Sequence, residues 1–215
     1  MYDTILFDLD GTLVDSGLGI TNSVAYSLKR FGIEVWDRTE LYRFIGPPLH
    51  ESYENYYGFS PEKAKEAVEV YREYYRKKGI YENKVYDGIL DLLMRLYHAK
   101  KKLIVATSKP ETFAKQILRH VRLEEYFSYI AGSNLDGSRT KKEEVISYAL
   151  AAGGVTDLKK AVMVGDREYD ILGAKKAGID GIGVLFGYGS REELCKSGAV
   201  FTADCPRDIF SFLIQ

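Results

Sequence analysis

Four short apolar runs constrain the fold of this chain more than any other feature of its sequence. They occupy residues 4–7, 102–106, 161–164 and 181–185. Polar residues follow the first three directly or after one glycine: Asp8, Thr107 and Asp166. A continuous apolar run that ends in polar groups is typical of a buried parallel strand, which presents those groups at its carboxyl end.

Helical patterns separate these runs. Apolar residues recur three and four positions apart in 87–99, in a helix that Pro110 opens, in 142–152, and in 169–177, which Gly178 closes. Weaker strand-like runs occupy 129–132 and 199–201. Because strands alternate with helices, we predict an α/β fold with a doubly wound, mostly parallel sheet. Ligands of such sheets bind at the carboxyl ends of the strands.

Residues 15–83 interrupt this alternation, since they contain no convincing strand. Helical patterns cover 20–31, 38–44 and 61–78, and in the last of these Ser60 is placed to cap the helix that Pro61 begins. We therefore predict a helical cap domain at 15–83, inserted into an α/β core domain formed by 1–14 and 84–215.

Composition excludes several classes of protein. The net charge of -1 gives no general attraction for nucleic acid or a membrane surface. No apolar run approaches the ~18 residues that a membrane span needs. Cys195 and Cys205 lack metal-ligand spacing, which favours two free thiols. The amino-terminal residues lack signal-peptide features. We expect a cytoplasmic monomer, with a dimer as the alternative.

Asp8 and Asp10 are the first candidate catalytic residues. Two carboxylates two residues apart at a strand end can share Mg²⁺, which prefers oxygen ligands, and still have different roles. One can attack phosphorus, and the other can protonate the leaving oxygen. Gly11 allows the sharp turn that brings the backbone near a substrate. A pair of solvated or helix-capping aspartates is the alternative that Asp8 and Asp10 alone would leave open.

Further polar groups lie at the other predicted strand ends. The Thr107 hydroxyl can bind a phosphoryl oxygen. Thr107 and Ser108 lie just before the helix that Pro110 opens, whose free amides favour an anion, although both residues could also simply cap that helix. Asp166 can bind the metal from the side opposite Asp8, and Asp170 can hold a metal-bound water or a lysine. Helix capping is the alternative for these two aspartates as well.

The string from Asp8 to Leu13, Asp-Leu-Asp-Gly-Thr-Leu, resembles the first motif of the haloacid dehalogenase-like hydrolase superfamily, and the later motifs follow in order along the chain. The resemblance implies that Asp8 is the nucleophile of a phosphatase. It also implies that Asp10 is its acid/base and gives a backbone carbonyl to Mg²⁺. The expected phosphoryl-binding groups are Thr107 and the amides near Leu9 and Ser108.

The same resemblance implies a cation at the start of the helix at 142–152. Lys141 and Lys142 are neighbours there, and only one of them can point inward. We favour Lys142, because relatives commonly have Lys-x-x-Val-Ile, which matches Lys142 to Ile146; Lys141 is the alternative. Such a cation would balance the charge of the nucleophile and of the transferred phosphoryl group.

The position of the insert resembles the phosphoglycolate phosphatase-like and β-phosphoglucomutase-like branch. Residues 43–49 resemble its substrate-facing cap loop, which makes Arg43 and Gly46 candidate substrate contacts. An exposed cation at a helix end is the alternative for Arg43. The motifs are similar both to phosphoglycolate phosphatases and to 5'-nucleotidases, and we expect the former activity with the latter as alternative. A phosphomutase and a non-catalytic binding module are further alternatives.

Other site types find less support. The glycine-rich residues 181–189 do not form a dinucleotide fingerprint, no phosphate-binding P-loop motif is present, and the three histidines lack ligand spacing. Aromatic residues are frequent in the insert, where they could stack a base, but their helical spacing favours a place in the core. These are Tyr42, Phe44, Tyr53, Tyr56 and Tyr57.

Overall fold

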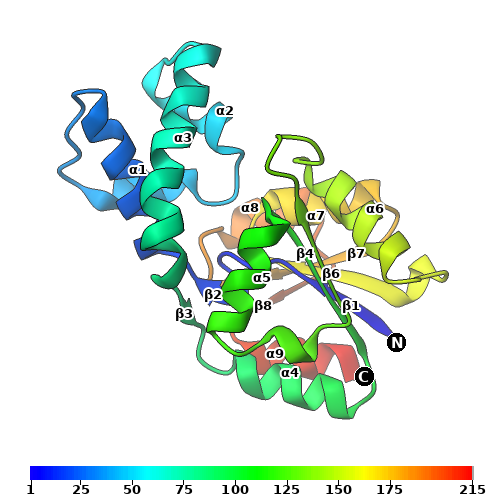
Figure 1. The fold of residues 1–215 in the computed structure, drawn as a ribbon. Helices are drawn as coiled ribbons and strands as arrows, with labels where there is room; N and C mark the ends of the chain where they lie inside the picture. Colours follow the sequence, from blue (N-terminus) through cyan, green and yellow to red (C-terminus); the bar gives the residue numbers. More distant parts are fainter. Residues whose placement is uncertain (215) are drawn as a thin grey trace. The chain divides into compact units, whose positions relative to one another are not determined.

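The computed structural model describes residues 1–214, and the chain folds as two compact units (Figure 1). One unit comprises Met1–Asp15 and the chain from Val85 onward, and the other comprises Ser16–Lys84. The first is an α/β unit built on a six-stranded parallel sheet, as the alternation of strands and helices predicted. The second is helical, and its role as a cap stays a prediction.

The sheet of the α/β unit has the strand order β5-β4-β1-β6-β7-β8. Its strands are β1 (Thr4–Phe7), β4 (Lys102–Pro110), β5 (Tyr129–Ser133), β6 (Ala161–Gly165), β7 (Asp180–Val184) and β8 (Phe201–Ala203). The short strands β2 (Val14–Asp15) and β3 (Lys84–Val85) form a separate two-stranded sheet where the chain passes from one unit to the other.

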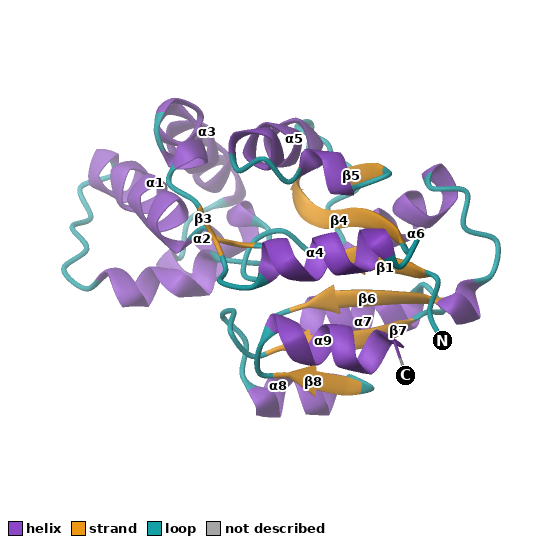
Figure 2. Cartoon of the chain, turned by 90° about the horizontal axis from the view of Figure 1, so that it is seen from below, coloured by secondary structure: helices purple, strands orange, loops and turns teal. Residues whose placement is uncertain are grey.

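Helices cover both faces of the main sheet. They are α4 (Ile89–His98), α5 (Glu111–His120), α6 (Lys142–Ala152), α7 (Glu168–Lys176), α8 (Arg191–Ser197) and α9 (Pro206–Ile214), with short 3₁₀ turns at Glu124–Tyr126 and Leu158–Lys160. Figure 2 shows α4 and α9 in front of the strands and α7 behind them. Helix α4 packs against α9 on the one face, and α6, α7 and α8 pack in sequence on the other.

The core between the sheet and helices α6 and α7 explains why these elements form. Short apolar side chains on alternate positions of the strands meet the apolar faces of the two helices, and burying them removes their surface from water. This cluster comprises Leu6, Ile104, Ala106, Ala131, Val145, Ile146, Ala149, Leu150, Ala161, Met163, Ala174 and Ile179.

Strand β1 lies in the middle of the sheet, and its register decides where polar side chains meet. Phe7 pairs with Val105 of β4 on one side and with Val164 of β6 on the other. The Asp8 N–H continues this ladder by donating to Val164 O at 2.9 Å. The residues that follow each paired position therefore emerge at one edge of the sheet.

The helical unit contains α1 (Gly17–Arg30), α2 (Leu49–Tyr57) and α3 (Pro61–Lys77), with 3₁₀ turns at Arg38–Phe44 and Gly79–Tyr81. Ser60 caps α3 by accepting a hydrogen bond from Lys63 N–H, and Pro61 occupies its first turn, as predicted. Helix α1 packs on α3 and also lies close to the 3₁₀ turn at Gly79–Tyr81, where a Cβ on Gly19 would lie 2.2 Å from Gly79 O. Among residues 1–214, no helix is long and apolar enough to cross a membrane.

Several predicted boundaries shift. Strand β4 continues to Pro110, whose backbone is extended (ψ 130°), so α5 begins one residue after the predicted start. The last strand is Phe201–Ala203 rather than 199–201, because Ala199 N–H bonds Leu194 O and completes the end of α8. The predicted helix at 38–44 is a 3₁₀ helix, and helices α2, α8 and α9 were not predicted. Both cysteines are free, as expected.

Candidate active site

The strand ends of the α/β unit bring together Asp8, Asp166 and Asp170. Asp8 follows β1, Asp166 follows β6, and Asp170 lies in the first turn of α7. One carboxylate oxygen from each lies within 4.8 Å of the others, and all three residues are buried. Three buried carboxylates this close repel one another, so the cluster needs cations for its stability.

Lys142 supplies one positive charge to this cluster. Its Nζ lies 3.0 Å from Asp8 Oδ1 and 2.8 Å from Asp170 Oδ1, and it donates to Ala106 O at 3.3 Å. These three partners match the three N–H groups of an ammonium. Lys141, by contrast, is exposed at the N-cap of α6. The structure therefore places Lys142, not Lys141, next to Asp8.

Burial changes the pKa of these groups. It raises the pKa of Asp8 to about 6; Lys142 opposes this shift, and Asp170 and Asp10 add to it. Burial also raises the pKa of Asp166 well above its usual value, with a further contribution from Asp170 and Asp8. For Lys142, burial lowers the pKa, but Asp170 and Asp8 outweigh burial and raise it, so this lysine is charged at neutral pH.

The residues present fit a divalent cation. Asp166 Oδ1 is buried and has no hydrogen-bond partner among residues 1–214, while Asp166 Oδ2 accepts from Tyr188 N–H at 2.8 Å. One lysine does not neutralise three carboxylates, and hard oxygen donors are the ligands that Mg²⁺ prefers. The side chain of Asp10 lies outside this cluster; Asp10 was predicted to bind through its backbone carbonyl, which the carboxylate positions do not test.

Asp10 has a different partner, which the sequence did not suggest. Its Oδ2 lies 2.5 Å from Lys109 Nζ, and the Lys109 side chain is only 7% exposed. Lys109 follows the predicted Thr107–Ser108 pair directly, so its position at a strand end was the signal available for finding it. A buried cation beside Asp10 fixes the direction of that carboxylate.

Close backbone packing surrounds the carboxylates. Gly11 has φ +79°, and a Cβ there would lie 2.2 Å from Asp166 Oδ2. A Cβ on Gly165 would lie 2.1 Å from Asp170 Cγ, and one on Gly173 would lie 2.8 Å from Lys142 Cγ. Glycine at these positions therefore makes the room that the charged side chains occupy.

The remaining predicted site residues, which were expected to contact the substrate, lie partly in the α/β unit and partly in the helical unit. Thr107 is buried at the end of the regular part of β4, and its Oγ1 accepts from Lys109 N–H at 3.3 Å; Leu9 is buried and Ser108 half-buried. In the helical unit, Arg43 and Gly46 are both exposed. The Arg43 guanidinium lies 4.4 Å from the Tyr56 ring centre, a cation–π contact that gives this side chain a structural partner.

The insert's aromatic residues form a small core, as their spacing favoured. Phe44 and Tyr53 are buried and lie edge to face with their ring centres 5.1 Å apart. Tyr42 and Tyr56 remain 45% and 38% exposed. Base stacking is open to these exposed rings and closed to the buried pair.

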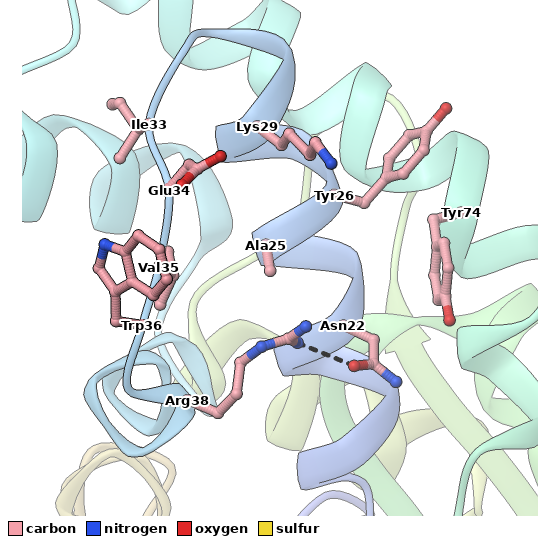
Figure 3. Close-up of a pocket in the computed structure, with 10 residues that line it drawn as sticks. All are labelled: Asn22, Ala25, Tyr26, Lys29, Ile33, Glu34, Val35, Trp36, Arg38 and Tyr74. Carbon is pink, nitrogen blue, oxygen red and sulfur yellow. Dashed lines mark hydrogen bonds between the residues drawn. The ribbon is translucent and has the colours of Figure 1, made fainter.

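A cavity of about 330 Å³ lies within the helical unit (Figure 3). It is lined by Asn22, Ala25, Tyr26, Lys29, Ile33, Glu34, Val35, Trp36, Arg38 and Tyr74. Figure 3 shows the Arg38 guanidinium turned toward Asn22, to whose Oδ1 it donates at 2.8 Å. None of the predicted site residues lines this cavity, so the chemistry is assigned to the strand ends.

Comparison with known proteins identifies the family. Residues 5–184 match the haloacid dehalogenase-like hydrolase family. A 5'-nucleotidase of Pseudomonas aeruginosa is 49% identical over 193 residues, which are 90% of this chain and 87% of that protein. The tyrosine-protein kinase PtkA of Mycobacterium tuberculosis is 42% identical, and the match spans 90% of this chain but 65% of that protein.

Comparison with solved structures also finds phosphatases. A predicted phosphatase from Clostridium acetobutylicum superposes with a TM-score of 0.96 at 48% identity, covering 100% of this chain and 99% of the other. The resemblance predicted from the Asp8 motif is thus confirmed over nearly the full length. The chain belongs to the haloacid dehalogenase-like hydrolases.

Proposed function

We propose that this phosphatase is a Mg²⁺-dependent phosphomonoesterase that hydrolyses a small phosphorylated metabolite through an aspartyl-phosphate on Asp8. The observation that supports this most is the contact between Asp8 and Lys142, both buried, at 3.0 Å. A buried carboxylate paired with a fixed cation is held in one orientation, and the same cation can offset the negative charge of an incoming phosphoryl group.

Asp8 is the nucleophile in this proposal. With its pKa raised to about 6, most of it is carboxylate at pH 7 and above, which is the form that attacks phosphorus. The Asp8 oxygen forms a bond to phosphorus while the bond from phosphorus to the leaving oxygen breaks. Hydrolysis of the resulting acyl phosphate then regenerates Asp8 and releases inorganic phosphate.

Asp10 acts as the general acid and then as the base. It donates a proton to the leaving oxygen and later removes one from the attacking water. The contact with Lys109 at 2.5 Å positions its carboxylate before substrate binds. Thr107 and the amides near Leu9 and Ser108 are the proposed hydrogen-bond donors to the phosphoryl oxygens.

The Asp8 and Asp166 carboxylates and the Asp10 carbonyl would hold Mg²⁺. The partnerless Asp166 Oδ1 supports this assignment. When bound, the ion supplies positive charge against the phosphoryl oxygens and the clustered carboxylates. Asp170 has another role, because it holds Lys142 through one oxygen and accepts from Arg167 N–H at 3.1 Å through the other.

For the substrate, we favour nucleoside 5'-monophosphates over phosphoglycolate, which reverses the order expected from the motifs. The relative named 5'-nucleotidase is 49% identical, whereas a phosphoglycolate phosphatase of Colwellia psychrerythraea is 27% identical. The helical unit, with Arg43, Gly46 and the exposed rings of Tyr42 and Tyr56, is proposed as the cap that selects the leaving group.

A screen of phosphate release tests this proposal. The purified protein with Mg²⁺ is incubated with nucleoside 5'-monophosphates, phosphoglycolate, β-glucose 1-phosphate and p-nitrophenyl phosphate. We expect the highest kcat/KM for a nucleoside 5'-monophosphate. Preference for phosphoglycolate would restore the first expectation, and glucose 6-phosphate formed from β-glucose 1-phosphate would identify a mutase. Failure to hydrolyse any ester between pH 5 and 9 would leave a non-catalytic binding module.

A further inference from the structure

The loop at 186–189 touches both the candidate metal carboxylate and the segments where the chain leaves and re-enters the α/β unit. Its backbone contact is the Tyr188 N–H, which donates to Asp166 Oδ2 at 2.8 Å. Its side-chain contact is the Tyr188 hydroxyl, which donates to Asp15 Oδ1 at 2.5 Å. Tyr188 therefore binds both Asp166, which follows β6, and Asp15, the last residue before the helical unit.

The loop is fitted to Asp166 by glycine on either side of Tyr188. A Cβ on Gly187 would lie 2.3 Å from Gly11 O and 2.4 Å from Asp166 Cβ. A Cβ on Gly189 would lie 1.9 Å from Asp166 O. Because the backbone approaches this closely on both sides, the loop and Asp166 cannot shift independently of each other.

The returning segment contacts the same loop. The Tyr86 and Phe186 rings meet edge to face with centres 5.3 Å apart, and the Tyr188 side chain interacts with Tyr86. Tyr86 N–H donates to Leu13 O at 3.2 Å, which joins the returning segment to the leaving one. Both crossing segments, 13–15 and 85–86, are thus anchored on one side of a four-residue loop.

We propose that Tyr188 is a positioning residue that couples the Asp166 carboxylate to the two crossing segments. A cation held by Asp166 Oδ1 fixes the carboxylate, the carboxylate fixes the Tyr188 backbone, and the Tyr188 hydroxyl transmits this restraint to Asp15. The inference rests on the proposed Mg²⁺ site. Burial and the hydrogen bond to Asp15 raise the pKa of Tyr188, so its hydroxyl keeps the donated proton at neutral pH.

Amide hydrogen exchange of the whole chain, with Mg²⁺ or with EDTA, tests the coupling. In the wild type, Mg²⁺ should slow exchange both at 186–189 and at the crossing segments. Tyr188→Phe keeps the N–H that binds Asp166 and removes only the hydroxyl. In this variant Mg²⁺ should still slow exchange at 186–189. At 13–15 and 85–86, the ratio of the exchange rate in EDTA to that in Mg²⁺ should fall about fivefold, the loss expected for one hydrogen bond.

Tyr2→Phe is the matched control, because the Tyr2 hydroxyl also bonds an aspartate, Asp180, at 2.7 Å, and Asp180 lies at the end of β7 opposite this loop. It should respond to Mg²⁺ like the wild type. An unchanged response of the crossing segments in Tyr188→Phe would overturn the coupling while leaving the proposed function intact. Absence of Mg²⁺ protection at 186–189 in the wild type would overturn the metal site and the coupling together, and phosphate release then decides the activity separately.

Discussion

The two units of this protein bury different kinds of polar group. In the α/β unit, the buried polar residues include charged ones: Asp8, Lys142, Asp166 and Asp170. In the helical unit, the buried polar residues described are hydroxyls: Ser16, Thr21, Ser23, Ser27 and Ser52. Charged groups stay buried only with compensating partners, whereas a single nearby carbonyl can satisfy a hydroxyl.

This difference separates chemistry from packing. Thr21 and Ser23 donate to carbonyls one turn earlier in α1, and Ser27 donates to Ala67 O of α3 at 2.7 Å. Such bonds satisfy buried hydroxyls and confer no reactivity. The α/β unit instead holds its charges in a crowded, pre-formed cluster. In the proposed function, this cluster breaks the phosphate ester bond and the helical unit selects the substrate.

The largest expected effect follows from removing the nucleophile. Asp8→Asn keeps the shape of the side chain but cannot form an acyl phosphate, so we expect kcat on any phosphate ester to fall by at least about 10³-fold. Circular dichroism should show an unchanged fold. Turnover within tenfold of the wild type would contradict the assignment of Asp8.

Removing the buried cation should lower stability strongly. Lys142→Met leaves the Asp8 and Asp170 carboxylates without their partner, which should cost about 3–5 kcal/mol of unfolding free energy in urea titrations at pH 7.5 with EDTA. Lys141→Met is the control, since Lys141 is exposed, and should stay within about 0.5 kcal/mol of the wild type. Equal effects of the two substitutions would remove the distinction between the neighbours.

The raised pKa of Asp8 predicts how stability depends on pH in the metal-free protein. Between its usual value and about 6, the folded state binds more protons than the unfolded state, so stability falls as pH rises through this window. The loss is on the order of 2–3 kcal/mol. Urea titrations with EDTA at pH 4.5 and 7.5 measure it. Asp8→Asn should show a smaller decline, and an identical decline would show that Asp8 does not contribute.

A buried hydroxyl of the helical unit should matter less. Ser27→Ala leaves Ala67 O without this donor, which should lower the unfolding free energy by about 0.5–1.5 kcal/mol. Phosphate release at saturating substrate should be unchanged, because the substitution lies outside the charged cluster. A loss of kcat comparable to that of Asp8→Asn would break the separation between the two units.

Arg43→Ala should have the smallest effect on the fold and act on substrate choice. Loss of the contact with Tyr56 should cost about 0.5–1 kcal/mol. If Arg43 binds a second polar group of the substrate, KM rises for the nucleotide or phosphoglycolate and stays constant for p-nitrophenyl phosphate. Equal changes in KM for all esters would reduce Arg43 to its packing role.

The sequence predicted the fold and much of the cluster because both follow from local patterns. The apolar runs predicted the parallel strands, and a parallel register necessarily brings the residues after Phe7 and Val164 to one edge. The position of Lys142 was harder to predict, since two adjacent lysines share the same local pattern. Which of them contacts Asp8 depends on the rotation of α6 on the sheet.

Lys109 and Tyr188 could not be assigned from the sequence for a different reason. Their partners, Asp10 and Asp15, lie far away along the chain, and no periodic pattern connects them. Tyr188 also acts partly through its backbone N–H, which every residue but proline possesses. Helix α2 was not predicted, and only its first residue, Leu49, had been assigned to the cap loop on resemblance.

The central position of β1 leaves this strand without its partners during part of synthesis on the ribosome. Thr4–Phe7 is made before its neighbours, β4 and β6, which follow only after the entire helical insert. At about 5–20 residues per second, Val105 is made about 5–20 s after Phe7. The insert is a compact unit of consecutive residues and can fold first, while β1 waits with both edges unpaired. An apolar strand in that state is prone to aggregate, so the nascent chain is a natural client for a chaperone before the sheet closes.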